Sequence, residues 1–148
     1  MAIPAFNEHG ILPEGVHDCS LAEIGERFGQ FQRTDARCRL FEQLKGFLGQ
    51  VSATGFVIEV IIDGSFVTAK DDPNDIDLIL VLRSNHDFSA ALRTLEYNVL
   101  SRHEVRRIWR FDMLLAQEGK SATSAEIEFF SLVRDRPELR KGMVRVQL

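Results

Sequence analysis

Two aspartates at the start of an apolar run are the residues with the clearest chemistry in this sequence. Asp75 and Asp77 flank Ile76 and lead into the run 78–82. Side chains of a strand alternate between its faces, so a strand over 75–82 would point both carboxylates the same way and bury the apolar residues. Two adjacent carboxylates repel each other unless a cation lies between them, and Mg²⁺ takes oxygen ligands that it shares with substrate phosphates. The pair therefore predicts a site for Mg²⁺ or Mn²⁺.

A Gly-Ser pair upstream predicts a phosphate site beside this metal. Gly64 and Ser65 follow an apolar stretch at 56–62 that is typical of a strand. Glycine lets the backbone approach a ligand closely, and the serine offers a hydroxyl and an N–H to phosphate oxygens. Lys70, in the polar loop 69–74, is a further candidate for the triphosphate of an NTP, and a solvated loop lysine is its alternative. These residues together outline a nucleotide-binding site.

A third carboxylate, Asp112, lies in a further predicted strand at 105–116, on the face that it would share with Ile108, Arg110 and Leu114. Aspartate is rare within strands and is seldom buried without a partner. Asp112 is therefore expected either to bind metal or to pair with Arg107 or Arg110.

The combination of Gly64-Ser65 with Asp75-x-Asp77 and its apolar run resembles the signature of the nucleotidyltransferase fold, which polymerase-beta-like, minimal and aminoglycoside nucleotidyltransferases share. The resemblance implies an α/β (α+β) domain with a mixed sheet flanked by helices. It also implies transfer of a nucleotidyl group from an NTP to a hydroxyl on a protein, RNA or small molecule. The superfamily carries its third acid on the strand after the next helix, which favours Asp112 as the ligand of the metal that activates the attacking oxygen. Asp75, Asp77 and Asp112 are thus the implied catalytic and metal-binding residues.

The chain resembles more closely an uncharacterised bacterial family of short nucleotidyltransferase-like proteins. The shared stretches are 3–13, 17–20, 63–68 and 141–144. The loop after Gly64-Ser65 lacks the Ala-Arg-Gly ending of many minimal nucleotidyltransferases, and the chain has no room for an acceptor-binding domain. A second chain is therefore expected to supply the acceptor. The alternative is a catalytically silent protein that binds nucleotide or a partner, in a toxin–antitoxin or phage-defence pair.

Composition predicts one soluble domain over residues 1–148. The chain is 45% hydrophobic and 27% charged, which is ordinary for a globular protein. Cys19 and Cys38 lack a metal-ligand spacing, and no signal peptide or membrane-length apolar run is apparent, so a cytoplasmic protein is expected. The net charge of −4 argues against broad binding to nucleic acid. A local basic cluster faces either phosphates or an acidic partner, or else solvent at a strand edge: Arg102, His103, Arg106, Arg107 and Arg110.

The remaining pattern predicts the elements that position these residues. Residues 1–19 form an extended arm, and Ser20 opens a capping box for a helix to Phe28. A core helix is expected from Thr34 to Val51, and another from Asp87 to Leu100 with Phe88, Leu92, Leu95 and Leu100 inward. A helix at 124–133 capped by Thr123 and a strand at 143–148 complete the prediction.

Overall fold

A mixed five-stranded sheet forms the centre of the computed structural model, which describes residues 3–119, 121–133 and 136–148, without the side chains of 121–124 and 126. Along the sheet the strands follow the order β1-β7-β2-β3-β4. β2 is antiparallel to both β3 and β7, whereas β3–β4 and β1–β7 are parallel pairs. The elements in chain order are β1 (Val16–Asp18), α1 (Leu21–Phe28), α2 (Ala36–Thr54), β2 (Val57–Asp63), the 3₁₀ turn η1 (Ser65–Val67), β3 (Asp77–Leu82), α3 (Thr94–Leu100), α4 (Arg102–Trp109), β4 (Asp112–Gln117), α5 (Ser121–Phe130), β5 (Leu132–Val133), β6 (Arg136–Arg140) and β7 (Met143–Gln147). The predicted α+β fold with a mixed sheet is confirmed.

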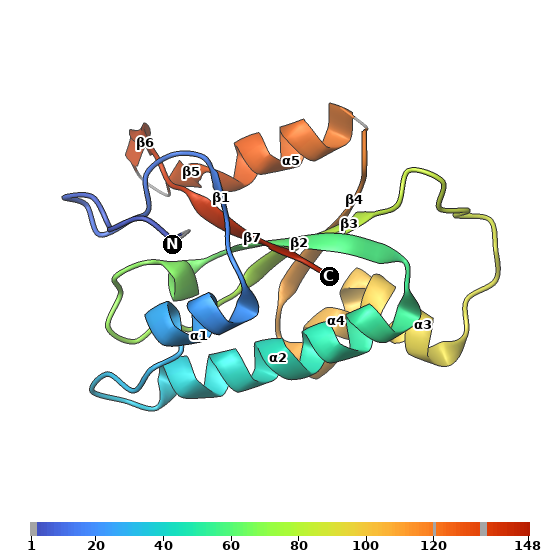
Figure 1. Ribbon diagram of the computed structural model, residues 1–148, viewed down its shortest axis with the longest axis horizontal. Helices are drawn as coiled ribbons and strands as arrows, with labels where there is room; N and C mark the ends of the chain where they lie inside the picture. The colour runs from blue at the N-terminus through green and yellow to red at the C-terminus, as the bar shows by residue number, and fades with distance from the viewer. Residues whose placement is uncertain (1–2, 120, 134–135) are drawn as a thin grey trace.

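Helices cover both faces of this sheet. Helices α1 to α4 lie on one side and α5 lies on the other (Figure 1). The larger core packs α1 and α2 against alternate residues of the strands, such as Val60, Ile62 and Leu80. A smaller cluster on the α5 side contains Ile61 and Ile79. Both sets of strand residues are buried because the sheet has a layer on each face.

The two N-terminal helices form close to the predicted places. Ser20 caps α1 with the expected capping box, in which its hydroxyl accepts from Glu23 N–H and Glu23 accepts from Ser20 N–H. α2 begins after Asp35 rather than at Thr34, and it runs to Thr54. Its predicted apolar stripe is buried throughout: Leu40, Leu44, Phe47, Leu48 and Val51.

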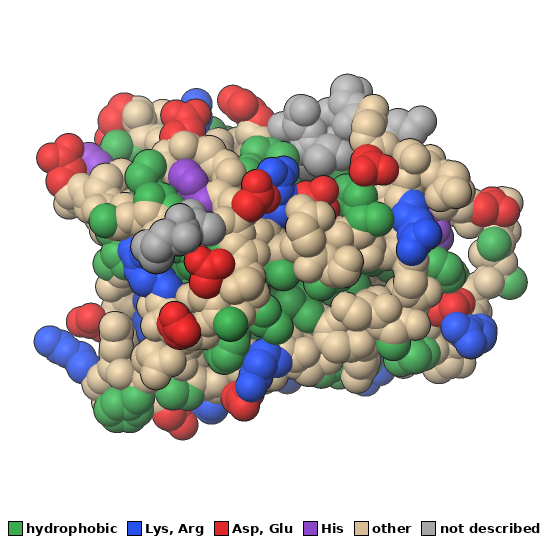
Figure 2. All heavy atoms as spheres, viewed as in Figure 1, with side chains coloured by type: hydrophobic (Ala, Val, Ile, Leu, Met, Phe, Trp, Pro, Cys, Tyr) green, Lys and Arg blue, Asp and Glu red, His purple; other side chains and the backbone are tan. Residues whose placement is uncertain are grey.

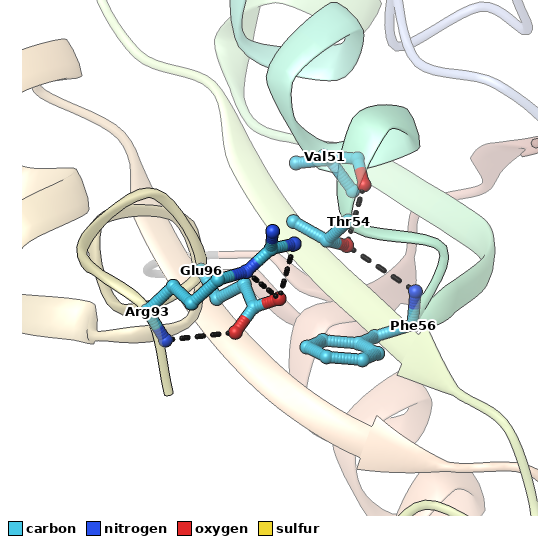
Figure 3. Close-up of polar contacts among 5 residues, drawn as sticks. All are labelled: Val51, Thr54, Phe56, Arg93 and Glu96. Carbon is cyan, nitrogen blue, oxygen red and sulfur yellow. Dashed lines mark hydrogen bonds and ion pairs between the residues drawn. The ribbon is translucent and has the colours of Figure 1, made fainter. Parts of the chain in front are cut away.

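The end of α2 is closed by a polar turn that directs the chain into β2. Thr54 Oγ1 donates to the Val51 carbonyl at 2.7 Å and accepts from Phe56 N–H at 3.2 Å (Figure 3). Gly55 has φ of 74°, a left-handed conformation that favours glycine. This turn places the start of β2 directly after α2.

The N-terminal arm is ordered because it joins the sheet and the core. Ile3 and Leu12 are buried, and Val16 to Asp18 form β1 beside β7. The Gly142 N–H donates to the Leu12 carbonyl at 2.9 Å. The arm therefore braces the segment that precedes β7, which was predicted at 143–148 and is observed at Met143–Gln147.

The predicted helix from Asp87 to Leu100 is wrong in its first half. Asp87 closes a turn by accepting from Ser89 N–H at 2.9 Å, and α3 begins only at Thr94. Glu96 then accepts from the backbone and guanidinium of Arg93 (Figure 3). Phe88, Leu92 and Leu95 are exposed, and Leu100 alone of the four predicted core residues is buried.

The predicted strand at 105–116 is also wrong, because its first half is helical. Ser101 caps α4 by accepting from Glu104 N–H, and Val105 faces the core while its neighbours are solvated. Arg110 ends the helix in a left-handed conformation with φ of 67°, and β4 begins at Asp112. Asp112 therefore starts a strand instead of lying within one.

The last helix, α5, begins at Ser121 and ends at Phe130, earlier than predicted at both ends. Thr123 lies inside this helix and does not precede it; its side chain and that of Glu126 are outside the described residues. None of the helices in the described parts of the chain has the length and apolar character needed to cross a membrane.

Candidate functional site

Three carboxylates lie in one row across neighbouring strands. Asp63 at the end of β2 pairs in register with Asp77 at the start of β3, and Asp77 pairs with Asp112 at the start of β4. Residues directly opposite each other on paired strands point to the same face. Since Ile61 and Ile79 share this face, the row (Asp63, Asp77 and Asp112) lies on the α5 side of the sheet.

The row borders a pocket of about 680 Å³ between the sheet and α5. A volume of this size suits a small-molecule ligand such as a nucleotide. The rest of the lining combines two cations with apolar side chains: Arg102, Lys141, Met113, Leu114, Phe129, Phe130, Leu132 and Val133. The pocket thus joins a charged part to an apolar part.

Asp63 is the most deeply buried acid of the row, with 1% of its surface exposed. Among the described residues, no donor of good hydrogen-bond geometry reaches either of its carboxylate oxygens, although the Gly64 N–H and the Lys141 ammonium are close enough to lower its pKa. The nearest cation is the Lys141 ammonium, 3.4 Å from Asp63 Oδ2. Burial raises the pKa of Asp63 to about 7, and Lys141 opposes that rise. Because a buried carboxylate without well-aligned hydrogen bonds is costly, Asp63 is an unusual residue to find here.

Asp77 lies at the middle of the row and is half-buried. Burial, followed by the negative charges of Asp75 and Asp112, raises its pKa to about 6. Lys141 and Arg106 oppose this rise. The acids therefore destabilise one another's charged forms, as expected for carboxylates that share a site.

Asp75 does not share a strand with Asp77, which corrects the sequence prediction. It precedes β3, and its Oδ1 accepts from the Ser65 N–H at 2.8 Å and from the Ser65 hydroxyl. That hydroxyl accepts in turn from the N–H groups of Asn74 and Asp75 at 3.2 and 3.3 Å. The polar groups of Ser65 thus close the loop between β2 and β3.

Gly64 is required by the chain's own backbone. Its φ is 97°, and a Cβ there would lie 2.8 Å from the Asp75 carbonyl oxygen and 3.0 Å from the Asp77 nitrogen. The sequence predicted that a ligand would approach the Gly64 backbone closely. The backbone of residues 75–77 occupies that place instead. Lys70 is exposed and does not line the pocket; its carbonyl accepts from Arg37 Nη2 at 2.7 Å.

Asp112 is the exposed end of the row. Its carboxylate pairs with Arg106. The sequence had predicted Arg107 or Arg110 as the partner in the alternative to metal binding. Arg107 pairs with Glu104 on the same helix at 2.8 Å. Because the Asp112–Arg106 pair is solvated, it contributes roughly 0–1 kcal/mol and is easily replaced.

A comparison with protein families identifies the family of this chain. Residues 4–147 match the model of DUF6932, a family of unknown function. The chain belongs to this family. No curated protein and no solved structure matches the chain. The match covers the whole acid row and the Lys141 segment, so both lie within the part that the family shares.

The acid row in this DUF6932 chain has the charge of a cation site but does not have the geometry of one as its side chains stand. Among the described residues, no group of three or more His, Cys, Asp or Glu side chains is arranged so that it could hold a metal ion. The donor types nevertheless fit Mg²⁺ or Mn²⁺, because Asp77 and Asp112 are oxygen donors in register on neighbouring strands. A small rotation of exposed Asp112 away from Arg106 would be needed.

Two charged residues of the pocket were not predicted as site residues. Asp63 and Lys141 both fall within stretches that carried the family resemblance, yet neither was assigned a role. An acid that directly ends an apolar strand was a usable signal for Asp63. Lys141 had no local signal, since the link between residues 63 and 141 arises from the pairing of β2 with β7.

Proposed function

We propose that the protein is a metal-dependent nucleotidyltransferase that moves a nucleotidyl group from an NTP to a hydroxyl acceptor. The observation that carries the proposal is the row of three carboxylates in register on β2, β3 and β4, directly beside Gly64-Ser65. The raised pKa values of Asp63 and Asp77, in a pocket, are typical of functional sites. Resemblance to the nucleotidyltransferase signature agrees with this arrangement.

In this proposal Asp77 and Asp112 hold Mg²⁺ or Mn²⁺, and Asp75 contributes the oxygen that does not contact Ser65. A bound divalent ion would supply charge neutralisation for phosphate oxygens and lower the pKa of the attacking hydroxyl. Asp63 and Lys141 form the buried floor, where Lys141 offsets part of the negative charge. Gly64 and Ser65 keep the β2–β3 loop in place beside the row, where the Ser65 N–H donates to Asp75 Oδ1.

The reaction balances without any further reactant. The acceptor oxygen forms a bond to the α-phosphorus of the NTP, and its proton passes to Asp112. The bond from the α-phosphorus to the bridging oxygen breaks, and pyrophosphate leaves with the electron pair. The sequence predicts a cytoplasmic protein, and Cys19 and Cys38 are free thiols. Such a protein would meet NTP in the cytoplasm.

A second candidate function is nucleotide or partner binding without transfer. The Ser65–Asp75 and Asp112–Arg106 contacts favour it, because they engage groups that transfer would need. A protein of this kind could act with a second chain in a toxin–antitoxin or phage-defence pair.

Calorimetry and a transfer assay test the proposal and separate the two candidates. We expect ATP, GTP, CTP or UTP to bind in the presence of Mg²⁺ or Mn²⁺, and Asp77→Asn to weaken this binding at least tenfold. Asp35→Asn is a matched control, since Asp35 is exposed, lies outside the pocket and makes no side-chain cap hydrogen bond to α2. NTP binding that needs no metal and is unchanged by Asp77→Asn would contradict the proposed metal site. Binding without transfer of label from an α-labelled NTP to protein, RNA or small hydroxyl acceptors would favour the silent alternative.

A further inference from the structure

Helix α3 and the loop before it, residues 83–93, carry an apolar surface. Phe88, Leu92, Leu95 and Tyr97 are between 40% and 61% exposed. Hydrophobic side chains reach the surface at the end of the molecule where this loop lies, on the right of Figures 1 and 2. Large apolar side chains that gather at a surface are typical of an interaction site. A ligand is therefore expected to cover them.

The apolar surface contains a hollow of about 180 Å³, the apolar hollow. Phe88, Leu92 and Tyr97 line it from the exposed side chains named above. Leu100 of α3 and Leu115 of β4 complete its apolar lining. Because these side chains come from a loop, a helix and a strand, one apolar group placed in the hollow would contact all three.

Aromatic and polar contacts hold the loop beside this hollow. The ring centroid of His86 lies 4.6 Å from that of Phe88 and 5.1 Å from that of Phe56, just before β2. Gln117 Nε2, at the end of β4, donates to the Arg83 carbonyl at 3.1 Å. The hollow is therefore formed before a ligand arrives, which reduces the entropy cost of binding.

A second hollow, the basic hollow, adjoins the apolar one. It has a volume of about 270 Å³, and its lining includes Arg102 and Arg106 of α4. Ser101 lines the apolar hollow and Arg102 the basic one, and Leu115 and Met113 of β4 are divided in the same way. Strand residues two apart lie on one face at a separation of about 7 Å, so the two hollows are direct neighbours.

The basic hollow leaves one arginine available to a carboxylate. Arg106 pairs with Asp112, and Arg107 pairs with Glu104. Arg102 is exposed and has no ion-pair partner in the parts of the chain that the structure describes. An anion can therefore bind Arg102 without displacing another contact.

We propose that the two hollows together bind an extended segment of a partner protein. An aromatic or aliphatic side chain of that segment occupies the apolar hollow, and a carboxylate two residues away pairs with Arg102. Side chains two residues apart in an extended chain lie on one side, about 7 Å apart, which matches the spacing of Met113 and Leu115. Burial of the apolar side chain supplies most of the affinity, and the charge pair sets the register. Neither a metal ion nor nucleotidyl transfer is needed for this binding.

The charges around the two hollows favour a protein segment over a nucleic acid. Asp87 is exposed and lines the apolar hollow. A nucleic acid carries a phosphate at each nucleotide, so a strand that reached both hollows would bring negative charge close to Asp87. A protein segment can be acidic at Arg102 and uncharged beside Asp87. The complementary ligand is therefore acidic at one end and apolar at the other.

Fluorescence anisotropy with a labelled synthetic peptide of the repeat Phe-Ser-Glu-Ser tests the inference. We expect wild type to bind this peptide at low salt. Leu92→Ser should weaken binding about tenfold and Arg102→Gln about three- to fivefold. Phe31→Ser and Arg39→Gln are the matched controls, because both residues are exposed and lie outside the two hollows.

A second peptide, in which glutamine replaces glutamate, isolates the charge pair. It should bind wild type more weakly than the acidic peptide does. It should also bind wild type and Arg102→Gln equally, because the carboxylate that Arg102 would contact is missing. If Arg102→Gln weakens the binding of both peptides by the same factor, the pairing with a carboxylate is overturned.

The remaining outcomes concern the class of partner. The inference is overturned if the acidic peptide does not bind at low salt, or if the controls weaken its binding as much as Leu92→Ser and Arg102→Gln do. A single-stranded oligonucleotide that binds with the same Leu92 dependence would assign the surface to nucleic acid instead. Self-association in sedimentation that Leu92→Ser abolishes would assign it to a second copy of the chain. Either result overturns the assignment to a partner protein.

Discussion

Two buried charges, Arg37 and Asp63, lie in this molecule in opposite electrostatic situations. Arg37 on α2 is 3% exposed, and Asp63 at the end of β2 is 1% exposed. The arginine is surrounded by acceptors, whereas the aspartate has no hydrogen-bond donor of good geometry among the described residues. Burial of a charge is costly unless hydrogen bonds compensate for it, so the cost is offset at Arg37 and largely left standing at Asp63.

Arg37 anchors the loop on which the site depends. Its Nη1 donates to the carbonyls of Phe28 and Phe66, at 3.3 and 2.7 Å, and its Nη2 donates to those of Thr68 and Lys70, at 2.6 and 2.7 Å. These carbonyls come from the end of α1 and from the segment just after Gly64-Ser65. One guanidinium group therefore fixes the start of the β2–β3 loop, and only Nε lacks a partner within the described structure.

Asp63 belongs to the pocket instead. Its carboxylate faces Lys141 and lies in the row with Asp77, and its pKa is raised to about 7. The comparison shows that a buried charge with many hydrogen bonds supports the fold, and that one without them is maintained at a cost to the fold. Such a cost is typical of functional sites.

The largest effect on stability is expected at Arg37. Arg37→Met would leave four backbone carbonyls without their donor, so we expect the free energy of unfolding to fall by about 3–5 kcal/mol. That is a large share of the roughly 5–15 kcal/mol that holds a domain together. Urea unfolding followed by circular dichroism measures the loss.

Arg39→Met is the matched control, because Arg39 pairs with Asp35 in a solvated i,i+4 contact. It should cost less than about 0.5 kcal/mol. If Arg37→Met fails to fold, Arg37→Lys keeps the charge but loses the fork and should unfold at lower urea than wild type. Equal stability of the Arg37 and Arg39 variants would contradict the anchoring role.

The next effect concerns Asp63 and pH. The unfolded chain releases the Asp63 proton near pH 4, and the folded chain holds it until about pH 7. Between these values the folded state binds more protons, so the contribution of Asp63 to stability is fully present below pH 4 and is lost as pH rises to 7, by up to about 4 kcal/mol. Asp77, with its pKa raised to about 6, acts in the same direction.

Urea unfolding in metal-free buffer across this pH range isolates the effect. Asp63→Asn should show a smaller loss of stability from pH 4 to 7 than wild type, and Asp35→Asn should keep the wild-type slope. Lys141→Met should move the end of the transition above pH 7, because Lys141 lowers the pKa of Asp63. A wild-type slope that survives in Asp63→Asn would show that Asp63 does not titrate as described.

The sequence predicts the sheet much better than the segments between its strands. β2, β3 and β7 contain short runs of apolar, mostly branched residues that are typical of buried strands, and α1 and α2 carry caps or a buried stripe. Residues 105–111 contain β-branched and aromatic residues among arginines, which predicted a strand, yet they form the end of α4 and a left-handed turn at Arg110. The pattern was ambiguous because α4 has one buried residue, Val105, and a short amphipathic helix resembles a strand over so few positions.

The site residues could likewise be predicted only where they lie on strands with a clear apolar pattern. Asp77 and Asp112 come together as expected, since both start strands that pair in parallel. The spacing of Asp75 and Asp77 predicted that both lie on one strand. The hydrogen bond from Ser65 to Asp75, which holds Asp75 in the loop, cannot be read from that spacing. Asp63 joins the row only through the register of β2 with β3, and register depends on contacts across the chain that local pattern does not contain.

The smallest effect on stability is expected at Asp112, the exposed end of the row. Its side chain is 56% exposed and pairs with Arg106, which is 62% exposed, so loss of the pair costs about 0–1 kcal/mol. Asp112→Asn also removes a charge that raises the pKa of Asp77, which relieves repulsion. These contributions oppose each other, and the free energy of unfolding in metal-free buffer should stay within about 1 kcal/mol of wild type.

Metal binding distinguishes Asp112 from an ordinary surface acid. If Asp112 binds the ion, Asp112→Asn should leave the fold intact, weaken Mn²⁺ binding at least tenfold and abolish transfer, whereas Asp35→Asn should change none of these. Paramagnetic resonance of free Mn²⁺ measures the affinity directly. A variant that binds Mn²⁺ and transfers label as well as wild type would remove Asp112 from the site. The contrast with the hydrogen-bonded Arg37 would then concern Asp63 and Asp77 alone. Asp112 would be an exposed acid that forms an ion pair with Arg106.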